Sequence, residues 1–183
     1  KLQEFQRELP ELTGLRQGAP QLDQRIGLAT GETVIGSIGS KNSKNYTIIG
    51  DTVNLAARLE AANKVYGTEL LVCERTAQST RKYEFRLIDK IRVYGKTEPN
   101  SIYTVINNDD FTTDEMTEIR DISQSAFSAY SSANFVEAVK AYQNILAIYP
   151  NDAVAKIFLS RIEILKNKDF NEGWDGVWQI GKS

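Results

Sequence analysis

The sequence predicts an α+β region over residues 1–107 and an all-helical region after it. Two observations support this fold class. Short apolar runs typical of strands alternate with helix-like segments up to residue 107. Beyond an acidic, turn-rich stretch at 108–115, apolar residues recur only at helical spacing. We therefore expect a linker at 108–115 and a helical appendage with a tail at 116–183.

The first elements follow from local patterns. Residues 1–12 carry apolar side chains at helical spacing and predict a helix that ends at Pro10. Residues 13–24 contain Gly, Gln and Pro and predict a loop. Two apolar runs follow at 26–29 and 33–38, and the Thr-Gly-Glu between them predicts a β-hairpin.

A strand followed by a helix is predicted next. The segment YTII at 46–49 is strand-like, and apolar residues recur on one helical face over 51–66. Asp51 or Thr52 can cap the free N–H groups at the start of this helix. Gly67 stands where a helix often ends in a left-handed conformation.

The remaining elements are shorter or entirely helical. Residues 69–73 predict a strand and 74–82 a short helix, and residues 83–106 predict two antiparallel strands joined by the turn YGKTEPN. Three helices are expected after the linker, at about 114–131, 134–149 and 152–167.

Composition excludes several classes of function. The chain has no histidine, which rules out imidazole general-base chemistry and His-ligated metals. A net charge of −2 gives no basic excess for general nucleic-acid binding, so no nucleic-acid partner is expected. The single cysteine, Cys73, fits a reducing compartment and is interpreted as a buried strand residue without a function.

Two further features concern the context of the chain. No apolar run approaches the roughly 18 residues of a membrane span, so we expect a cytoplasmic protein whose parent can still be membrane-attached. The chain begins at Lys1 within a charged helical pattern and without a signal peptide. This start suggests a fragment of a longer protein.

The segment NYTIIGDTVNLAARLE at 45–60 carries the most chemical information. It predicts a strand, a glycine turn and a helix on which Asn54 and Arg58 share one face. A neutral amide beside a permanent, bidentate cation near a helix N-terminus suits an anionic, phosphorylated ligand. On composition alone, a solvated helix face explains the same two residues.

This segment, together with RIGLATGETVIGSIGS at 25–40, closely resembles the second half of the class III adenylate/guanylate cyclase catalytic domain. The resemblance covers roughly residues 20–106 and implies a partial ferredoxin-like cyclase sheet with helices. It implies an enzyme that converts ATP to 3′,5′-cyclic AMP and pyrophosphate, most similar to adenylate cyclases. A non-catalytic nucleotide-binding or dimerisation module of a signalling protein, and a guanylate cyclase, remain as alternatives.

The resemblance also implies roles for individual residues. Asn54 matches the asparagine that orients the ribose, and Arg58 matches the arginine that stabilises charge at the reacting phosphate. Thr47 occupies the adenine-reading position and resembles a Thr-type subgroup of adenylate cyclases, whereas guanylate cyclases usually have Cys there. Lys96, in the turn VYGKTEP, resembles the lysine that binds the triphosphate. An ordinary strand threonine and an exposed turn lysine are the alternatives for the last two.

In this family the metal-binding aspartates come earlier in the chain, and no such motif precedes Arg25. Two divalent ions, Mg²⁺ or Mn²⁺, are therefore expected to be held by residues upstream, with no metal ligand in this chain. Asp51 is expected to cap its helix. Family sites form between two protomers, so the resemblance implies a homodimer and an isolated fragment that is inactive.

The predicted helices resemble a tetratricopeptide-type pair, although a simple amphipathic bundle explains the pattern too. The residues that carry this resemblance are Ala126, Tyr130, Phe135, Ala138 and Tyr142. About one and a half repeats are too few to stand alone, so we expect packing against the cyclase region or a protein partner. Trp174 and Trp178 are expected to anchor the tail on a neighbouring surface.

Overall fold

A computed structural model describes residues 6–10, 23–40, 43–92, 99–106, 111–166 and 174–177 of the chain. Residues 6–10 are helical. The other elements, in chain order, are β1 (Ile26–Leu28), β2 (Val34–Ser40), β3 (Ser43–Ile49), α2 (Asp51–Tyr66), β4 (Leu70–Cys73), α3 (Glu74–Gln78), β5 (Phe85–Arg92), β6 (Pro99–Val105), α4 (Thr113–Ser131), α5 (Phe135–Ile148) and α6 (Ala153–Leu165). The α+β class and the three C-terminal helices are confirmed.

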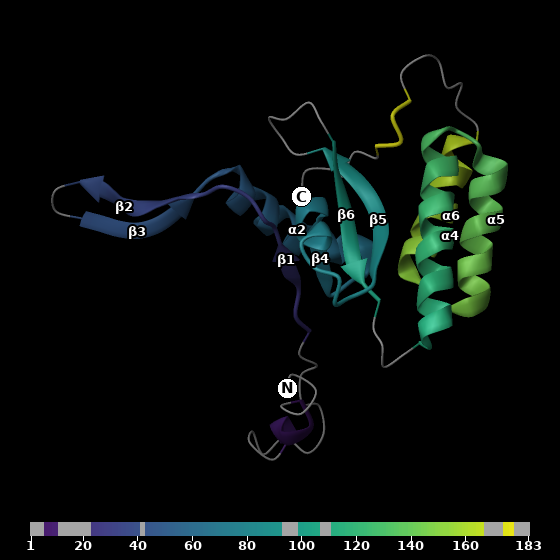
Figure 1. The fold of residues 1–183 in the computed structure, drawn as a ribbon, viewed down its shortest axis with the longest axis horizontal. Helices are drawn as coiled ribbons and strands as arrows, with labels where there is room; N and C mark the ends of the chain where they lie inside the picture. Colours follow the sequence, from purple (N-terminus) through teal and green to yellow (C-terminus); the bar gives the residue numbers. More distant parts are fainter. Residues whose placement is uncertain are drawn as a thin grey trace.

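The central sheet has four strands in the order β1-β4-β6-β5. β1 pairs with β4 in parallel, and β6 runs antiparallel to both β4 and β5. Figure 1 shows α4, α5 and α6 as a bundle beside the β5 edge, with α2 close to β1 and β4. The predicted antiparallel pair within residues 83–106 is confirmed as β5 and β6.

The predicted hairpin between residues 26–29 and 33–38 is wrong. β1 pairs with β4, which lies 44 residues further on at the Ile26–Leu70 register. β2 instead pairs with β3 in an antiparallel hairpin, which projects from the body as an arm (Figure 1). Two adjacent apolar runs allow a local hairpin, but parallel pairing with β4 lets α2 pack across β1 and bury its apolar face.

One hydrophobic core joins the sheet, α2 and the three C-terminal helices. Its fully buried members include Leu59 and Tyr66 of α2, Ile88 of β5, Tyr130 of α4 and Phe158 of α6. The expected packing of the helical region against the rest of the chain is therefore confirmed. The boundary at 107, with a linker at 108–115, stays a prediction about domains.

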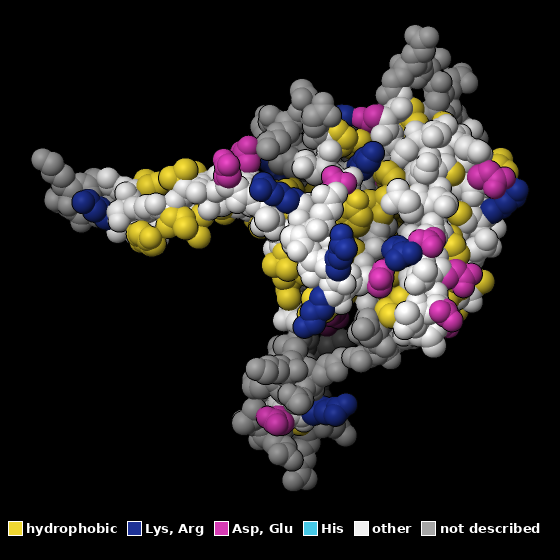
Figure 2. All heavy atoms as spheres, viewed as in Figure 1, with side chains coloured by type: hydrophobic (Ala, Val, Ile, Leu, Met, Phe, Trp, Pro, Cys, Tyr) yellow, Lys and Arg dark blue, Asp and Glu magenta, His cyan; other side chains and the backbone are white. Residues whose placement is uncertain are grey.

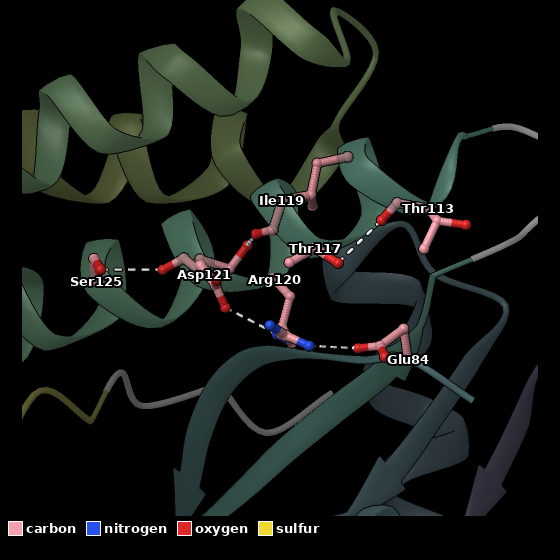
Figure 3. A network of polar contacts seen from close by, with 8 residues as sticks. Glu84, Thr113, Thr117, Ile119, Arg120, Asp121 and Ser125 are labelled. Carbon is pink, nitrogen blue, oxygen red and sulfur yellow. Dashed lines mark hydrogen bonds and ion pairs between the residues drawn. The ribbon is translucent and has the colours of Figure 1, made fainter. Parts of the chain in front are cut away.

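Helix α4 begins with a capping box and is tied to the sheet by exposed polar contacts. Thr112 accepts a hydrogen bond from the Glu115 N–H, and the Glu115 carboxylate accepts one from the Thr112 N–H. Arg120 bridges Glu84, just before β5, and Asp121 of its own helix (Figure 3). Such exposed pairs contribute little free energy individually.

The tail returns to the helical bundle. The indole N–H of Trp174 donates to the Tyr130 carbonyl at 3.1 Å, and its ring meets the Tyr130 ring edge-on. The predicted anchoring by Trp174 is confirmed, while Trp178 lies outside the described residues. Among the helices that the structure describes, none is long and apolar enough to cross a membrane.

Candidate functional site

Helix α2 is the platform of the candidate site, and two contacts fix it on β1. A Cβ added at Gly27 of β1 would lie 2.1 Å from the Ala56 carbonyl oxygen, so only glycine permits this close approach. The buried Asn63 amide donates to the Ile26 carbonyl at 3.0 Å, and its oxygen accepts from Thr68. The helix ends at Gly67 in the predicted left-handed conformation.

The start of α2 differs from the prediction. Its N-cap is Gly50, which makes no side-chain cap, so the proposed capping by Asp51 or Thr52 is wrong. The Thr52 hydroxyl donates instead to the Glu32 carbonyl at 3.0 Å, which ties the helix to the β1–β2 connection. Gly50 has a φ of 154°, a conformation that side chains disfavour, and this allows the sharp turn from β3 into α2.

Asn54 and Arg58 both lie on the exposed side of α2. At about 100° per residue they are roughly 40° apart around the helix axis, while Leu59 and Tyr66 face the core. Within the described part of the chain, neither side chain has a hydrogen-bond or ion-pair partner. The structure therefore presents an amide and a guanidinium together, unneutralised and open to a ligand.

Thr47 lies on β3, half-buried, shortly before the turn into α2. Its cross-strand partner on β2 is Gly36, and nothing lies within 4 Å of the position where a Gly36 side chain would begin. A glycine opposite a polar residue leaves room for another group to approach the strand. The strand–turn–helix connection thus brings Thr47 to the same end of the molecule as the start of α2.

The β2–β3 hairpin exposes apolar side chains on both of its faces, a feature that the sequence analysis missed. Ladder register puts Val34, Ile38 and Ile49 on the face of Thr47, and Ile35, Tyr46 and Ile48 on the other. All six are exposed, Val34 by 72% and Tyr46 by 78%. Figure 2 shows hydrophobic side chains along both sides of this arm. A two-stranded hairpin with two uncovered apolar faces is marginal alone and typical of an interaction surface.

Two further expectations concern Lys96 and the metal ions. Lys96 lies outside the described residues. Among the described side chains, no three His, Cys, Asp or Glu residues could together hold a metal ion. The resemblance places the metal ligands upstream of this chain, and that placement stays a prediction.

A cleft of about 600 Å³ opens beside the start of α2. Its lining includes Thr30, Asp51, Cys73 and Asn100. The exposed Asn54 and Arg58 and the half-buried Thr47 do not line it. Cys73 is buried as predicted. Burial alone would raise the pKa of its thiol, but hydrogen bonds with Thr76 and Thr30 outweigh it and lower the pKa.

Comparison with known proteins defines the class. Residues 4–107 match the adenylate and guanylate cyclase catalytic domain family, so the chain belongs to that family. It is 33% identical over 142 residues to the terminal-differentiation-specific adenylate cyclase of Dictyostelium discoideum, which covers 74% of this chain. It is 40% identical over 90 residues, 49% of the chain, to adenylate cyclase 1 of Rhizobium meliloti. It is 38% identical over 108 residues, 57% of the chain, to the adenylate cyclase of Anabaena cylindrica.

The chain spans only a small part of these relatives: the matches cover 7%, 14% and 21% of their lengths. Because the Dictyostelium match covers 74% of this chain, it extends beyond residue 107 into the helical region. Among solved structures, the adenylyl cyclase CyaB from P. aeruginosa is 30% identical with a TM-score of 0.46, and covers 57% of this chain and 53% of its own.

Proposed function

We propose that this chain is part of an adenylate cyclase that converts ATP to 3′,5′-cyclic AMP and pyrophosphate at a site shared by two protomers. The observation that carries the proposal is the pair Asn54 and Arg58, one turn apart on the uncovered face of α2. The chain's membership of the cyclase family and its similarity to three adenylate cyclases support the same activity.

The chemistry assigned to these residues is electrostatic and positional. The ribose 3′-hydroxyl attacks the α-phosphorus, loses its proton, and the bond to pyrophosphate breaks. Arg58 is proposed to stabilise the negative charge that builds up on the phosphate oxygens, since its guanidinium can donate two hydrogen bonds. Asn54 is proposed to hold the ribose, so that the attacking oxygen lies in line with the bond that breaks.

Recognition of the base is assigned to Thr47. Its hydroxyl can donate or accept a hydrogen bond, and the missing side chain at Gly36 leaves space beside it. This arrangement supports ATP as the substrate and the Thr-type subgroup as the place of this chain in the family. Lys96 is proposed to contact the triphosphate. The divalent ions, Mg²⁺ or Mn²⁺, supply charge neutralisation when bound, and their ligands are proposed to lie upstream of this chain.

The proposed partner is a second copy of the protein. Asn54 and Arg58 face solvent, and the adjacent hairpin exposes apolar residues such as Val34 and Tyr46 on both faces. A protomer that covers this hairpin would also close the open side of α2 and exclude water from the nucleotide. The C-terminal helices are proposed to be a tetratricopeptide-like pair completed by α6 and the sheet.

The test is Arg58→Ala in the full-length gene product. Removal of one such donor should lower cyclic AMP formation from ATP by roughly 100- to 1000-fold, with dimerisation unchanged. Lys64→Ala is the matched control, because Lys64 is an exposed cation on the same helix but lies away from the Asn54–Arg58 face. Turnover of the control should stay within about twofold.

The outcomes separate the proposal from its alternatives. Near-wild-type turnover in Arg58→Ala would reject the assigned role. Absence of any nucleotide turnover in the wild-type protein, with nucleotide still bound, would indicate a non-catalytic binding module. Conversion of GTP in preference to ATP would indicate a guanylate cyclase.

A further inference from the structure

We infer that Arg161, on α6 of the helical region, is a positioning residue for the cyclase site. It acts through the buried side chains of Asp89 and Tyr66, and thereby fixes helix α2, which carries Asn54 and Arg58. The expected effect on kcat rests on the proposed function, because it requires cyclase activity to be measured. It assigns the C-terminal helices a part in catalysis that does not depend on any partner.

The contact network joins three elements in a continuous chain. The Arg161 guanidinium donates to the Asp89 carboxylate of β5 at 2.5 Å and to the Tyr66 hydroxyl at 3.4 Å. Tyr66, the last residue of α2, donates its hydroxyl to the same Asp89 oxygen at 2.6 Å. The other Asp89 oxygen accepts from the Lys90 N–H at 2.7 Å. Strand, α2 and α6 therefore meet at one carboxylate.

All three side chains of the network are buried. Tyr66 and Asp89 are 0% exposed and Arg161 is 4% exposed. The guanidinium also lies over the Phe158 ring, 4.9 Å from its centroid. Burying a carboxylate costs its hydration free energy, and that cost is offset only while the cation stays paired with it. Asp89, Arg161 and Tyr66 are therefore strongly held in this geometry.

A second buried ion pair joins β5 to α6 with the opposite polarity. Arg86 of β5 forms two hydrogen bonds with Asp152, the N-cap of α6, and donates to Ser123 of α4. With the Asp89–Arg161 pair included, β5 contributes one cation and one anion to these pairs, and so does α6 together with its N-cap. Reversing the direction of α6 would bring like charges together, so the two pairs fix one orientation of α6 on β5.

Of the two pairs, the Asp89–Arg161 pair is the one that is hydrogen-bonded to α2, through Tyr66. Tyr66 lies on the buried face of that helix, about 18 Å along the axis from Asn54 at 1.5 Å per residue. Because the helix is a stiff unit, fixing Tyr66 fixes its rotation. A rotation of about 10° moves a group at the roughly 6 Å outer radius by about 1 Å. A misplacement of about 1 Å can cost a reaction about 100-fold.

The experiment compares Arg161→Met with Arg86→Met. The two pairs are matched, since their side chains are 5% and 0% exposed in one and 7% and 3% in the other. Loss of either cation leaves a buried carboxylate unpaired and should lower the unfolding temperature by about 10 °C. Well below that temperature, and measured in the full-length gene product, Arg161→Met should lower kcat by about 10- to 100-fold with little change in KM, and Arg86→Met by less than about twofold.

Two further measurements keep the inference testable if Arg161→Met folds poorly or the wild-type protein proves inactive. Tyr66→Phe removes only the hydroxyl and should lower kcat in the same direction with a small change in unfolding temperature. Amide hydrogen exchange of residues 52–66, measured on the 183-residue chain, should rise in Arg161→Met and Tyr66→Phe but not in Arg86→Met. Equal exchange in α2 for the two arginine variants, or equal losses of kcat, would overturn the inference. Absence of turnover in the full-length wild-type gene product, together with selective exchange in α2, would refute the proposed function alone.

Discussion

The two ends of this molecule differ in whether their apolar and charged side chains are covered and paired. The β2–β3 hairpin leaves apolar residues uncovered, with Tyr46 78% exposed, and the adjacent face of α2 leaves Arg58 without a partner among the described residues. The junction of β5 with α4 and α6 instead buries two complete ion pairs, with Asp89 0% exposed. Among the described residues, the first region is left uncovered, whereas the charges of the second are paired with one another.

This difference separates two kinds of role. A region that exposes apolar surface and unpaired polar groups gains free energy when something covers it. A region whose buried charges are already paired gains nothing from a partner, and serves to hold its elements in one arrangement. We therefore propose that ligand and partner binding involve the hairpin and α2, whereas the β5–α6 junction holds its elements rigid.

The largest effect is expected from a substitution in the core that the C-terminal helices share with the sheet. Phe158 is 0% exposed and its ring stacks on Tyr142 with centroids 4.8 Å apart. Phe158→Ala should lower the free energy of unfolding by about 3–5 kcal/mol. Ile164→Ala, on the same helix but 51% exposed, should cost less than about 1 kcal/mol. Urea unfolding followed by circular dichroism gives both values.

The number of unfolding transitions in the same experiment shows whether the sheet and the C-terminal helices unfold together. A shared core predicts that the sheet and the helices unfold in one transition, in circular dichroism and in amide exchange of β4 and β5 alike. Two separate transitions, with the sheet protected after the helices have melted, would divide the chain near residue 107 into independent domains.

A smaller effect is expected from the uncovered region. Tyr46→Glu places a charge on the hairpin and, in a symmetric dimer, should raise the dissociation constant by about 100-fold. The same change should alter monomer stability by less than about 0.5 kcal/mol, because Tyr46 is exposed. Val136→Glu is the matched control, since Val136 is 68% exposed on α5. Sedimentation equilibrium measures both variants.

Equal effects of the two substitutions on association would contradict the special role of the hairpin. Loss of association in Tyr46→Glu alone, together with loss of cyclic AMP formation, would tie the site to the dimer. Retained activity in a strictly monomeric variant would place the whole site within one chain.

The sequence predicted those parts of the molecule that depend on neighbouring residues. The segment from Thr47 through Arg58 was placed correctly on a strand, a glycine turn and a helix, because each step has a local pattern. The pairing of β1 with β4 and the ion pairs of β5 with α6 were not predicted. Arg86 and Asp152 are 66 residues apart and Asp89 and Arg161 are 72 apart, so no local spacing reveals them. The catalytic roles of Asn54, Arg58, Thr47 and Lys96 stay predictions.

The smallest effect lies at the surface of the second region, at the capping box that begins α4. Hydrogen bonds from the Thr112 N–H and hydroxyl lower the pKa of the Glu115 carboxyl below its ordinary value. The ionised form is therefore favoured by folding. Its stabilising contribution is complete above the unfolded pKa and is lost as the pH falls through the folded pKa. Glu115→Gln keeps a capping side chain but cannot titrate.

The difference in urea midpoint between wild type and Glu115→Gln should therefore be present at neutral pH and shrink toward zero in acid. Other carboxyl groups titrate equally in both proteins, so the difference isolates Glu115. A difference that stays constant with pH would show that the carboxylate contributes nothing as an anion. In contrast to the buried pairs of the same region, this cap is exposed, so the whole effect should also weaken as salt is added.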